Sequence, residues 1–310
     1  MNQGFLSLAH EMSKLAARGV EITEDTDNGK ARFSFAPHKI ADEITEEMES
    51  DFLVLMTGFL GVQTHPREKA FPVNDLEAAL AADLRFGMEI FAVAHEAIHV
   101  LQSSDPKRAN SSEVSPAVDE TDPDPHSVVR DAWQIEFNSD LAAAMLLIGA
   151  TRDNEALDAG FVSPIFGAFG ADWYFSSSSL VEQAAWLVYC GGIPPVEDEQ
   201  VATEMMAEDT FDEVARTRSH PPNWLRRRFV RIALAAQGIL GDGSQPDIGE
   251  YLRASSFGLF DRSRNALVEA GRVAREAGTL ERTRMWEIMS PRCGEVEDRK
   301  NRLRSSVTSG

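Results

Sequence analysis

The chain has 310 residues, an apolar content of 43% and a formal net charge of −20. This size and apolar content allow a large core, in two domains or in one domain with two lobes. The acidic charge argues against nucleic-acid binding, which needs clustered lysine and arginine. Cys190 and Cys293 are too few and too isolated for a disulfide framework. With no secretory signal and no apolar run of membrane-spanning length, we expect a soluble, cytoplasmic protein.

The first elements are a helix, a pair of strands and a second helix. Apolar residues at helical spacing predict a helix over residues 5–17. Residues 20–23 and 32–35 alternate apolar and polar around the turn signal Asp27-Asn28-Gly29. This arrangement predicts a β-hairpin. A second helix is predicted over residues 42–61.

The longest predicted helix covers residues 75–102 and opens with the capping-box pair Asn74 and Glu77. Near its end lies the motif His-Glu-x-x-His, whose histidines are His95 and His99. Residues four apart lie on one face of a helix, so both imidazole rings can bind one zinc ion. The flanking residues are uncharged and pack well, as a helix inside a protein requires.

A zinc site needs more than two histidines, and the next predicted helix, residues 127–149, supplies candidates. Glu136 and Asp140 are again four residues apart on one face. This spacing suits Glu136 as the third metal ligand and Asp140 as the carboxylate that holds a histidine ring by its other N–H. Glu96 lies next to the first ligand, where a carboxylate can take a proton from a metal-bound water.

The segment between the two ligand helices, residues 103–126, contains six acidic residues with serines and prolines. It is predicted to be a solvated, mobile connection. Since it joins the ligand helices, a lid and a selector for basic substrates are alternative roles. Beyond it, shorter helices are predicted over residues 180–189, 268–275 and 281–289, and one over 222–236.

Three ordered blocks resemble the gluzincin metallopeptidases. His-Glu-x-x-His followed by Glu136-x-x-x-Asp140 is similar to the thermolysin-like members. The stretch from Ser219 to Arg226, with His220-Pro221-Pro222 inside it, resembles a block of HtpX-like and Lit-type phage-exclusion peptidases. The sequence departs from these families in two ways. HtpX relatives have membrane spans, and no such span is predicted here. Ser139 stands where those families have alanine.

The resemblance implies that His220 points into the cleft. There it would stabilise the transition state or bind the metal as a regulatory fourth ligand, and a helix cap is the alternative. Its place before a helix favours a neutral imidazole. Arg226 would anchor this block or contact a substrate carbonyl. Tyr174 is a candidate hydrogen-bond donor to the oxyanion, although aromatic clusters usually belong to the core.

The resemblance also implies the fold: mainly α (α+β), a zincin-like metallopeptidase with a small N-terminal β-hairpin or sheet and a helical C-terminal part. In gluzincins the edge strand of that sheet aligns extended substrate. We divide the chain into residues 1–102 with the hairpin and the metal helix, the loop 103–126, the helical part 127–292 and a polar tail 293–310.

The sequence therefore predicts a zinc-dependent endopeptidase with one zinc ion per chain, acting on a protein or peptide substrate. His95, His99 and Glu136 would hold the metal, and Glu96 would be the general base. One alternative is a catalytically silent zinc-binding module that uses the cleft to bind a partner. Another is a zinc-free helical interaction protein in which the motif is coincidental.

Overall fold

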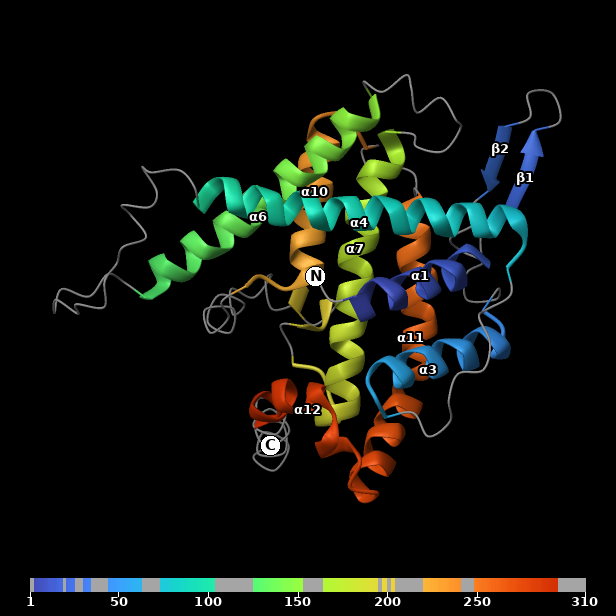
Figure 1. Ribbon diagram of the computed structural model, residues 1–310, viewed down its shortest axis with the longest axis vertical. Helices are drawn as coiled ribbons and strands as arrows, with labels where there is room; N and C mark the ends of the chain where they lie inside the picture. The colour runs from blue at the N-terminus through green and yellow to red at the C-terminus, as the bar shows by residue number, and fades with distance from the viewer. Residues whose placement is uncertain are drawn as a thin grey trace, which may run out of the picture. The chain divides into compact units, whose positions relative to one another are not determined.

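The chain is mainly α-helical in the computed structural model (Figure 1). It divides into two compact units, the first from residues 83–176 and 203–245 and the second from residues 2–82, 177–202 and 246–310. The structure describes residues 3–18, 21–25, 30–34, 44–62, 73–103, 125–152, 164–194, 197–199, 202–203, 220–240 and 248–294. Nearly all of the predicted acidic loop and the tail after residue 294 lie outside the described residues.

The first unit contains the described helices that carry the candidate metal ligands. They are the part of α4 (Asp75–Ser103) from residue 83 onward, α6 (Pro125–Arg152), the part of α7 (Pro164–Ala185) up to Ser176, and α10 (Asn223–Ala236). Gly170 of α7 lies against the backbone of Gly87 in α4, where a Cβ atom would collide with the carbonyl group. In α10, Arg227 Nε lies 2.6 Å from the buried Asp172 carboxylate of α7. These contacts fix α7 to both neighbouring helices.

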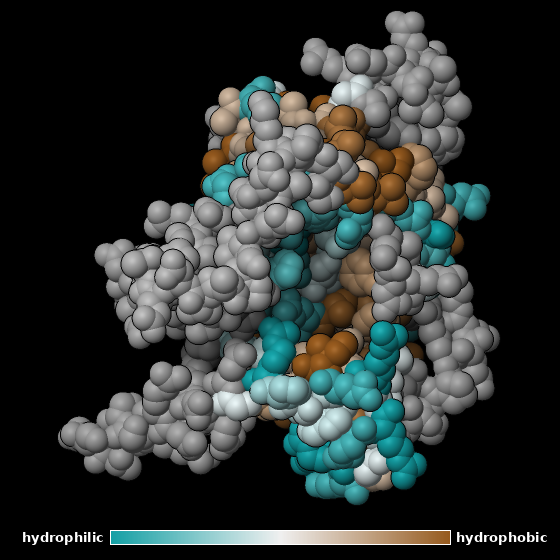
Figure 2. Space-filling model, turned by 60° about the vertical axis from the view of Figure 1, so that its left-hand side comes forward, coloured by the Kyte–Doolittle hydropathy of each residue, from teal (hydrophilic) through white to brown (hydrophobic). Residues whose placement is uncertain are grey.

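Helix α4 begins as predicted. Asn74 Oδ1 accepts a hydrogen bond from Glu77 N, and Glu77 Oε2 accepts one from Asn74 N, both at 2.9 Å. This capping box satisfies backbone N–H groups that a helix start otherwise leaves unpaired. One side of α4 is buried, through Leu80, Leu84, Met88 and Phe91, whereas Phe86, Val93 and Val100 are exposed. Apolar surface residues appear brown in Figure 2.

The second unit contains a core of helices from both ends of the chain. Its described elements are α1 (Gln3–Arg18), α3 (Glu46–Phe59), the π-helix η3 (Trp186–Cys190), α11 (Ile248–Glu276), η5 (Leu280–Arg282), α12 (Arg284–Met289) and η6 (Ser290–Arg292). Helix α11 packs on α1, α3 and η3. Gly271 allows its close approach to η3, because a Cβ atom there would collide with the Val188 carbonyl.

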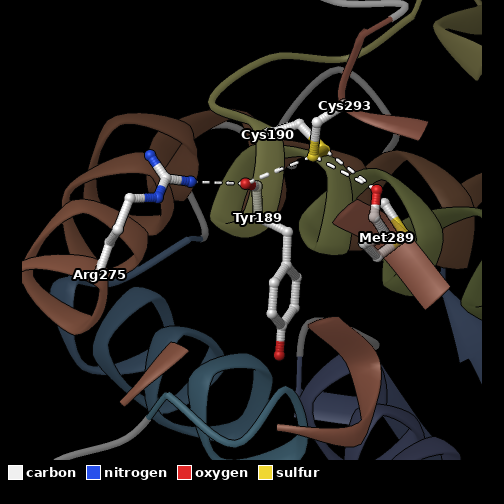
Figure 3. The surroundings of a disulfide bond; sticks show 5 residues. All are labelled: Tyr189, Cys190, Arg275, Met289 and Cys293. Carbon is white, nitrogen blue, oxygen red and sulfur yellow. Dashed lines mark hydrogen bonds between the residues drawn. A yellow bond between two sulfur atoms is a disulfide. The ribbon is translucent and has the colours of Figure 1, made fainter. Parts of the chain in front are cut away.

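The two cysteines are joined in this unit by a disulfide between Cys190 and Cys293, with Cα atoms 4.9 Å apart (Figure 3). Two cysteines make one cross-link and no framework, and the sequence did not predict this pair because folding brings together residues that are 103 positions apart. The neighbouring Tyr189 is buried, and its hydroxyl donates to the Leu60 carbonyl. Burial raises the pKa of that hydroxyl. Arg275 Nη2 donates to the Tyr189 carbonyl at 2.6 Å.

The expected fold class needs a correction. Strands β1 (Glu21–Asp25) and β2 (Lys30–Ser34) pair antiparallel, with Ile22 opposite Phe33. However, every side chain whose burial the structure describes lies in a helix or in a connection between helices. A small sheet integrated into an α+β, zincin-like domain is therefore not seen in that packed part, which is mainly α. Two strands can satisfy hairpin pairing without contributing to a core.

Several other predicted elements compare directly with the described helices. The predicted helices over residues 5–17, 42–61 and 222–236 correspond to α1, α3 and α10, with Pro222 as the N-cap residue of α10. Helices α7 and α11 begin well before the predicted starts at residues 180 and 268. In the described helices, no stretch combines the length and the apolar character needed to cross a membrane.

Candidate metal centre

His95 and His99 project from the same side of α4. Their Nε2 atoms are 2.9 Å apart and their ring centroids are 4.5 Å apart. The sequence positions explain this proximity, since a four-residue step brings side chains back to one helix face. The ring of His95 lies beside Phe91, one turn earlier, with centroids 6.3 Å apart.

Glu136 of α6 completes a group of three donors. Glu136 Oε2 lies 3.6 Å from His95 Nε2, and Glu136 Oε1 lies 3.5 Å from His99 Nε2. In a tetrahedral zinc site with bonds of about 2.05 Å, neighbouring ligand atoms lie about 3.3 Å apart. The two imidazole nitrogens are 2.9 Å apart, and each lies 3.5 or 3.6 Å from its nearer Glu136 oxygen. These distances bracket that value. This group could therefore hold a metal ion.

The three side chains are mostly buried but keep some contact with solvent, which suits a metal site that a substrate can reach. The side chains of His95, His99 and Glu136 are 11%, 29% and 12% exposed. Glu96 is an exposed residue of the same helix. It lies about 100° around the helix axis from His95 and 60° from His99. A carboxylate in that position is accessible to solvent next to the two imidazole rings.

Asp140 lies behind the first ligand. Its side chain is fully buried, and Oδ1 is 2.9 Å from His95 Nδ1. A carboxylate at this nitrogen favours the tautomer with the proton on Nδ1, so that Nε2, which lies 3.4 Å from Arg226 Nη2, carries the lone pair that could bind a metal. This is the contact that the four-residue spacing of Glu136 and Asp140 predicts. Close by, Ser139 Oγ donates to Gln102 Oε1 at 3.3 Å.

Arg226 of α10 contacts both carboxylates. Arg226 Nε and Nη2 donate to Asp140 Oδ2 and Oδ1 at 2.8 and 2.6 Å. Arg226 Nη2 also lies 3.0 Å from Glu136 Oε2. Burial lowers the pKa of Arg226, but the hydrogen bonds and charge of Asp140 and the charge of Glu136 outweigh this effect and raise it overall. The guanidinium is thus engaged within the site, which favours the anchoring role over a substrate contact.

The two remaining candidates lie at different depths. His220 is 67% exposed, and its Nε2 atom is 3.7 Å from Glu136 Oε1. It belongs to the surroundings of the metal group and is accessible to a ligand. Tyr174 packs its ring against Phe91 and Phe175, with centroids 5.4 and 5.5 Å apart. These ring contacts place Tyr174 in an aromatic cluster under the site.

Two residues near the metal group, Gln102 and Phe175, were not predicted from the sequence. Gln102 lies seven residues after His95, and that spacing of two helical turns is a signal that it shares the metal-facing side. The Phe175 ring lies under the Arg226 guanidinium, with 5.1 Å between the ring centroid and Arg226 Cζ. No local spacing connects Phe175 with Arg226, because they come from different helices.

The donor set fits zinc. Two imidazole nitrogens and one carboxylate oxygen form a ligand set of catalytic zinc sites, which keep a fourth position open. No protein-family model, no curated protein and no solved structure matches the chain. The chemistry of the site is therefore inferred from its residues alone.

Proposed function

We propose that this chain is a zinc-dependent endopeptidase that is selective for a particular protein substrate. The observation that carries the proposal is the convergence of His95 Nε2, His99 Nε2 and the Glu136 carboxylate on one point. The exposed Glu96 beside them supports catalysis rather than a structural role. A structural zinc site is usually closed by four protein ligands and has no use for a base beside the metal.

The residues have separate roles in this proposal. His95, His99 and Glu136 would hold one zinc ion, which when bound supplies Lewis-acid activation of a water molecule and of the scissile carbonyl. Glu96 accepts a proton from the attacking water and delivers it to the leaving amine. His220 donates a hydrogen bond from a ring N–H to the carbonyl oxygen as negative charge develops there. Its exposure to solvent is compatible with that contact.

Peptide or protein is the proposed substrate class, and the net charge of −20 disfavours nucleic acid. A cytoplasmic location is the expectation from the sequence, and the Cys190–Cys293 disulfide weighs against it. Disulfides persist in oxidising compartments and are rare in the cytosol. Labelling of free thiols in native cells tests the location, since two labelled cysteines support the cytoplasm and none supports an oxidising compartment.

The first experiment is elemental analysis of the purified protein beside two variants. Wild type and Gln134→Ala, a change at an exposed position of α6, should contain one zinc per chain. Glu136→Ala should lose most of it, since it removes one of three ligands. Zinc retained in Glu136→Ala would move the third ligand elsewhere. A chain that takes up no zinc after reconstitution would overturn the proposal.

Activity is then measured on a mixture of peptides derived from a whole proteome, with new termini identified by mass spectrometry. Such a mixture includes sites that a generic protease substrate lacks. New termini that appear with wild type and disappear after zinc removal would support a peptidase. One bound zinc without any cleavage would favour the silent zinc-binding module.

A further inference from the structure

Arg226 Nη2 lies next to two of the three candidate metal ligands, 3.0 Å from Glu136 Oε2 and 3.4 Å from His95 Nε2. The guanidinium also forms a two-point contact with Asp140, whose other neighbour is His95 Nδ1. The side chain is only 11% exposed. Such a contact with a carboxylate depends on the planar, forked guanidinium, which lysine does not have.

The two oxygens of Glu136 have different surroundings. Oε2 lies 3.0 Å from Arg226 Nη2 and 3.6 Å from His95 Nε2, whereas Oε1 faces His99 Nε2 at 3.5 Å and His220 Nε2 at 3.7 Å. An oxygen paired with a guanidinium has less electron density to offer a metal ion. The ion pair with Arg226 therefore favours Oε1 as the oxygen that would bind a metal ion. One-point binding by the carboxylate keeps the coordination number low, as a four-coordinate zinc site requires.

The backbone that carries Arg226 is itself held in place. The next residue, Arg227, lies 2.6 Å from the buried Asp172 carboxylate, and Arg231 lies 3.1 Å from the same group. The Phe175 ring lies under the guanidinium at 5.1 Å. Arg226 is thus fixed by its own helix, by α7 and by the ring, and it has little freedom to follow a misplaced carboxylate.

We propose that Arg226 is a positioning residue that sets the coordination geometry of the metal centre. It pairs with one oxygen of Glu136 and, through Asp140, holds the ring of His95, so that both ligands would meet a bound metal ion in a fixed orientation. The inference rests on the metal site of the proposed function. It goes beyond that function because a side chain that binds no metal itself would control how many ligand atoms the metal has.

Charge and geometry predict opposite effects of removing Arg226. A guanidinium near a cation repels it, so loss of the charge alone would strengthen metal binding. Loss of a group that orients metal ligands weakens binding, by about 10- to 100-fold in comparable sites. The positioning role predicts the second result. Arg226→Lys separates the two causes, since it keeps the charge and loses the fork.

The experiment is a titration of the full chain with Co²⁺, followed by visible absorption. Four-coordinate Co²⁺ absorbs strongly and five- or six-coordinate Co²⁺ absorbs weakly. Arg228, an exposed residue of the same helix, supplies the matched control. We expect intense absorption in wild type and Arg228→Gln. Arg226→Gln should bind Co²⁺ about 10- to 100-fold more weakly and absorb less per bound ion. Arg226→Lys should not restore either property.

Circular dichroism checks that each variant is folded. If Arg226→Gln does not fold, Arg226→Lys carries the test with the same expected loss. Unchanged or tighter Co²⁺ binding with an unchanged spectrum, in the folded variant, would overturn the positioning role and leave the proposed function intact. A wild-type chain that binds no Co²⁺ would overturn the metal site and both proposals together.

Discussion

The surroundings of Arg226 in the first unit and of Tyr189 in the second use polar side chains in different ways. In the first unit, Arg226 contacts side-chain carboxylates, including that of Glu136 at 3.0 Å. In the second unit, Arg275 donates to the backbone carbonyl of Tyr189 at 2.6 Å. The Tyr189 hydroxyl in turn donates to the backbone carbonyl of Leu60. The surroundings of Arg226 gather charged groups around a point, and the contacts of Tyr189 and Arg275 tie side chains to the backbone.

This difference separates binding from stability. Carboxylate oxygens and imidazole nitrogens that face one another keep lone pairs available to a cation. Side chains that end on backbone carbonyls satisfy buried acceptors and fix the elements that carry them. Changes around the candidate metal ligands should therefore alter metal binding or cleavage. Changes around Tyr189 and the disulfide should alter the free energy of unfolding and leave metal binding unchanged.

The largest expected effect is that of Glu96→Gln on cleavage. Loss of the general base should lower the cleavage rate by about 10²- to 10⁴-fold, while zinc content stays at one per chain. Glu89→Gln on the same helix is the matched control, because Glu89 pairs with Arg85 near the surface. Rates come from mass spectrometry of the cleaved peptides. A Glu96→Gln variant that cleaves like wild type would refute the role of Glu96.

The next largest effect is expected from the double change Cys190→Ser and Cys293→Ser. Removing a cross-link between residues 103 positions apart frees the unfolded chain, which should lower the free energy of unfolding by about 2–5 kcal/mol. Urea unfolding without reductant measures it, and wild type with reductant should show the same loss. Co²⁺ affinity should not change. A loss of Co²⁺ binding in the folded variant would break the separation between the two regions.

Tyr189→Phe should have a smaller effect on stability. The Leu60 carbonyl would lose its phenol donor, and a buried acceptor left unpaired costs about 1–3 kcal/mol. Thr283 Oγ1, 2.9 Å from the same hydroxyl, would lose that contact too. Urea unfolding again provides the measurement, with Co²⁺ affinity as the readout that should stay constant. Stability equal to wild type would show that water replaces the phenol.

The smallest effect concerns pH. Burial raises the pKa of Asp83 from 3.8 to about 6. The folded state therefore holds this proton more tightly than the unfolded state, and Asp83 lowers stability as pH rises from about 4 to about 6. Because the group is partly exposed, screening reduces the cost to about 1 kcal/mol. Asp83→Asn should stabilise the protein by that amount at pH 7 and not at pH 3.5. An equal effect at both pH values would contradict this assignment.

Features set by local spacing could be predicted from the sequence. The start of α4 follows from Asn74 and Glu77, whose reciprocal hydrogen bonds need only a three-residue separation. The approach of His95 to His99 follows from the helical repeat. The meeting of α4 with α6 was inferred from chemistry, since a pair of histidines needs a third ligand and Glu136 was the best-spaced candidate.

Features set by packing between distant segments could not be predicted in this way. The part of α7 before residue 180 contains two glycines and four consecutive serines, none of them a strong helix former, and its Gly170 is required by the approach to Gly87. Likewise, the first half of α11 includes Gly258, where a Cβ atom would meet Ile44. The contact of Arg226 with Asp140 joins residues 86 positions apart. No periodicity within one element encodes that distance.

The disulfide turns the stretch from Cys190 to Cys293 into a closed covalent ring. A single backbone cut anywhere inside that ring opens it and leaves both products attached to each other. The ring contains α10, with Arg226, and the whole of α11. A chain that cleaved itself there would keep its full mass on a non-reducing gel and separate into fragments only after reduction. Comparing the two gels therefore detects cuts inside the ring and distinguishes them from cuts outside it.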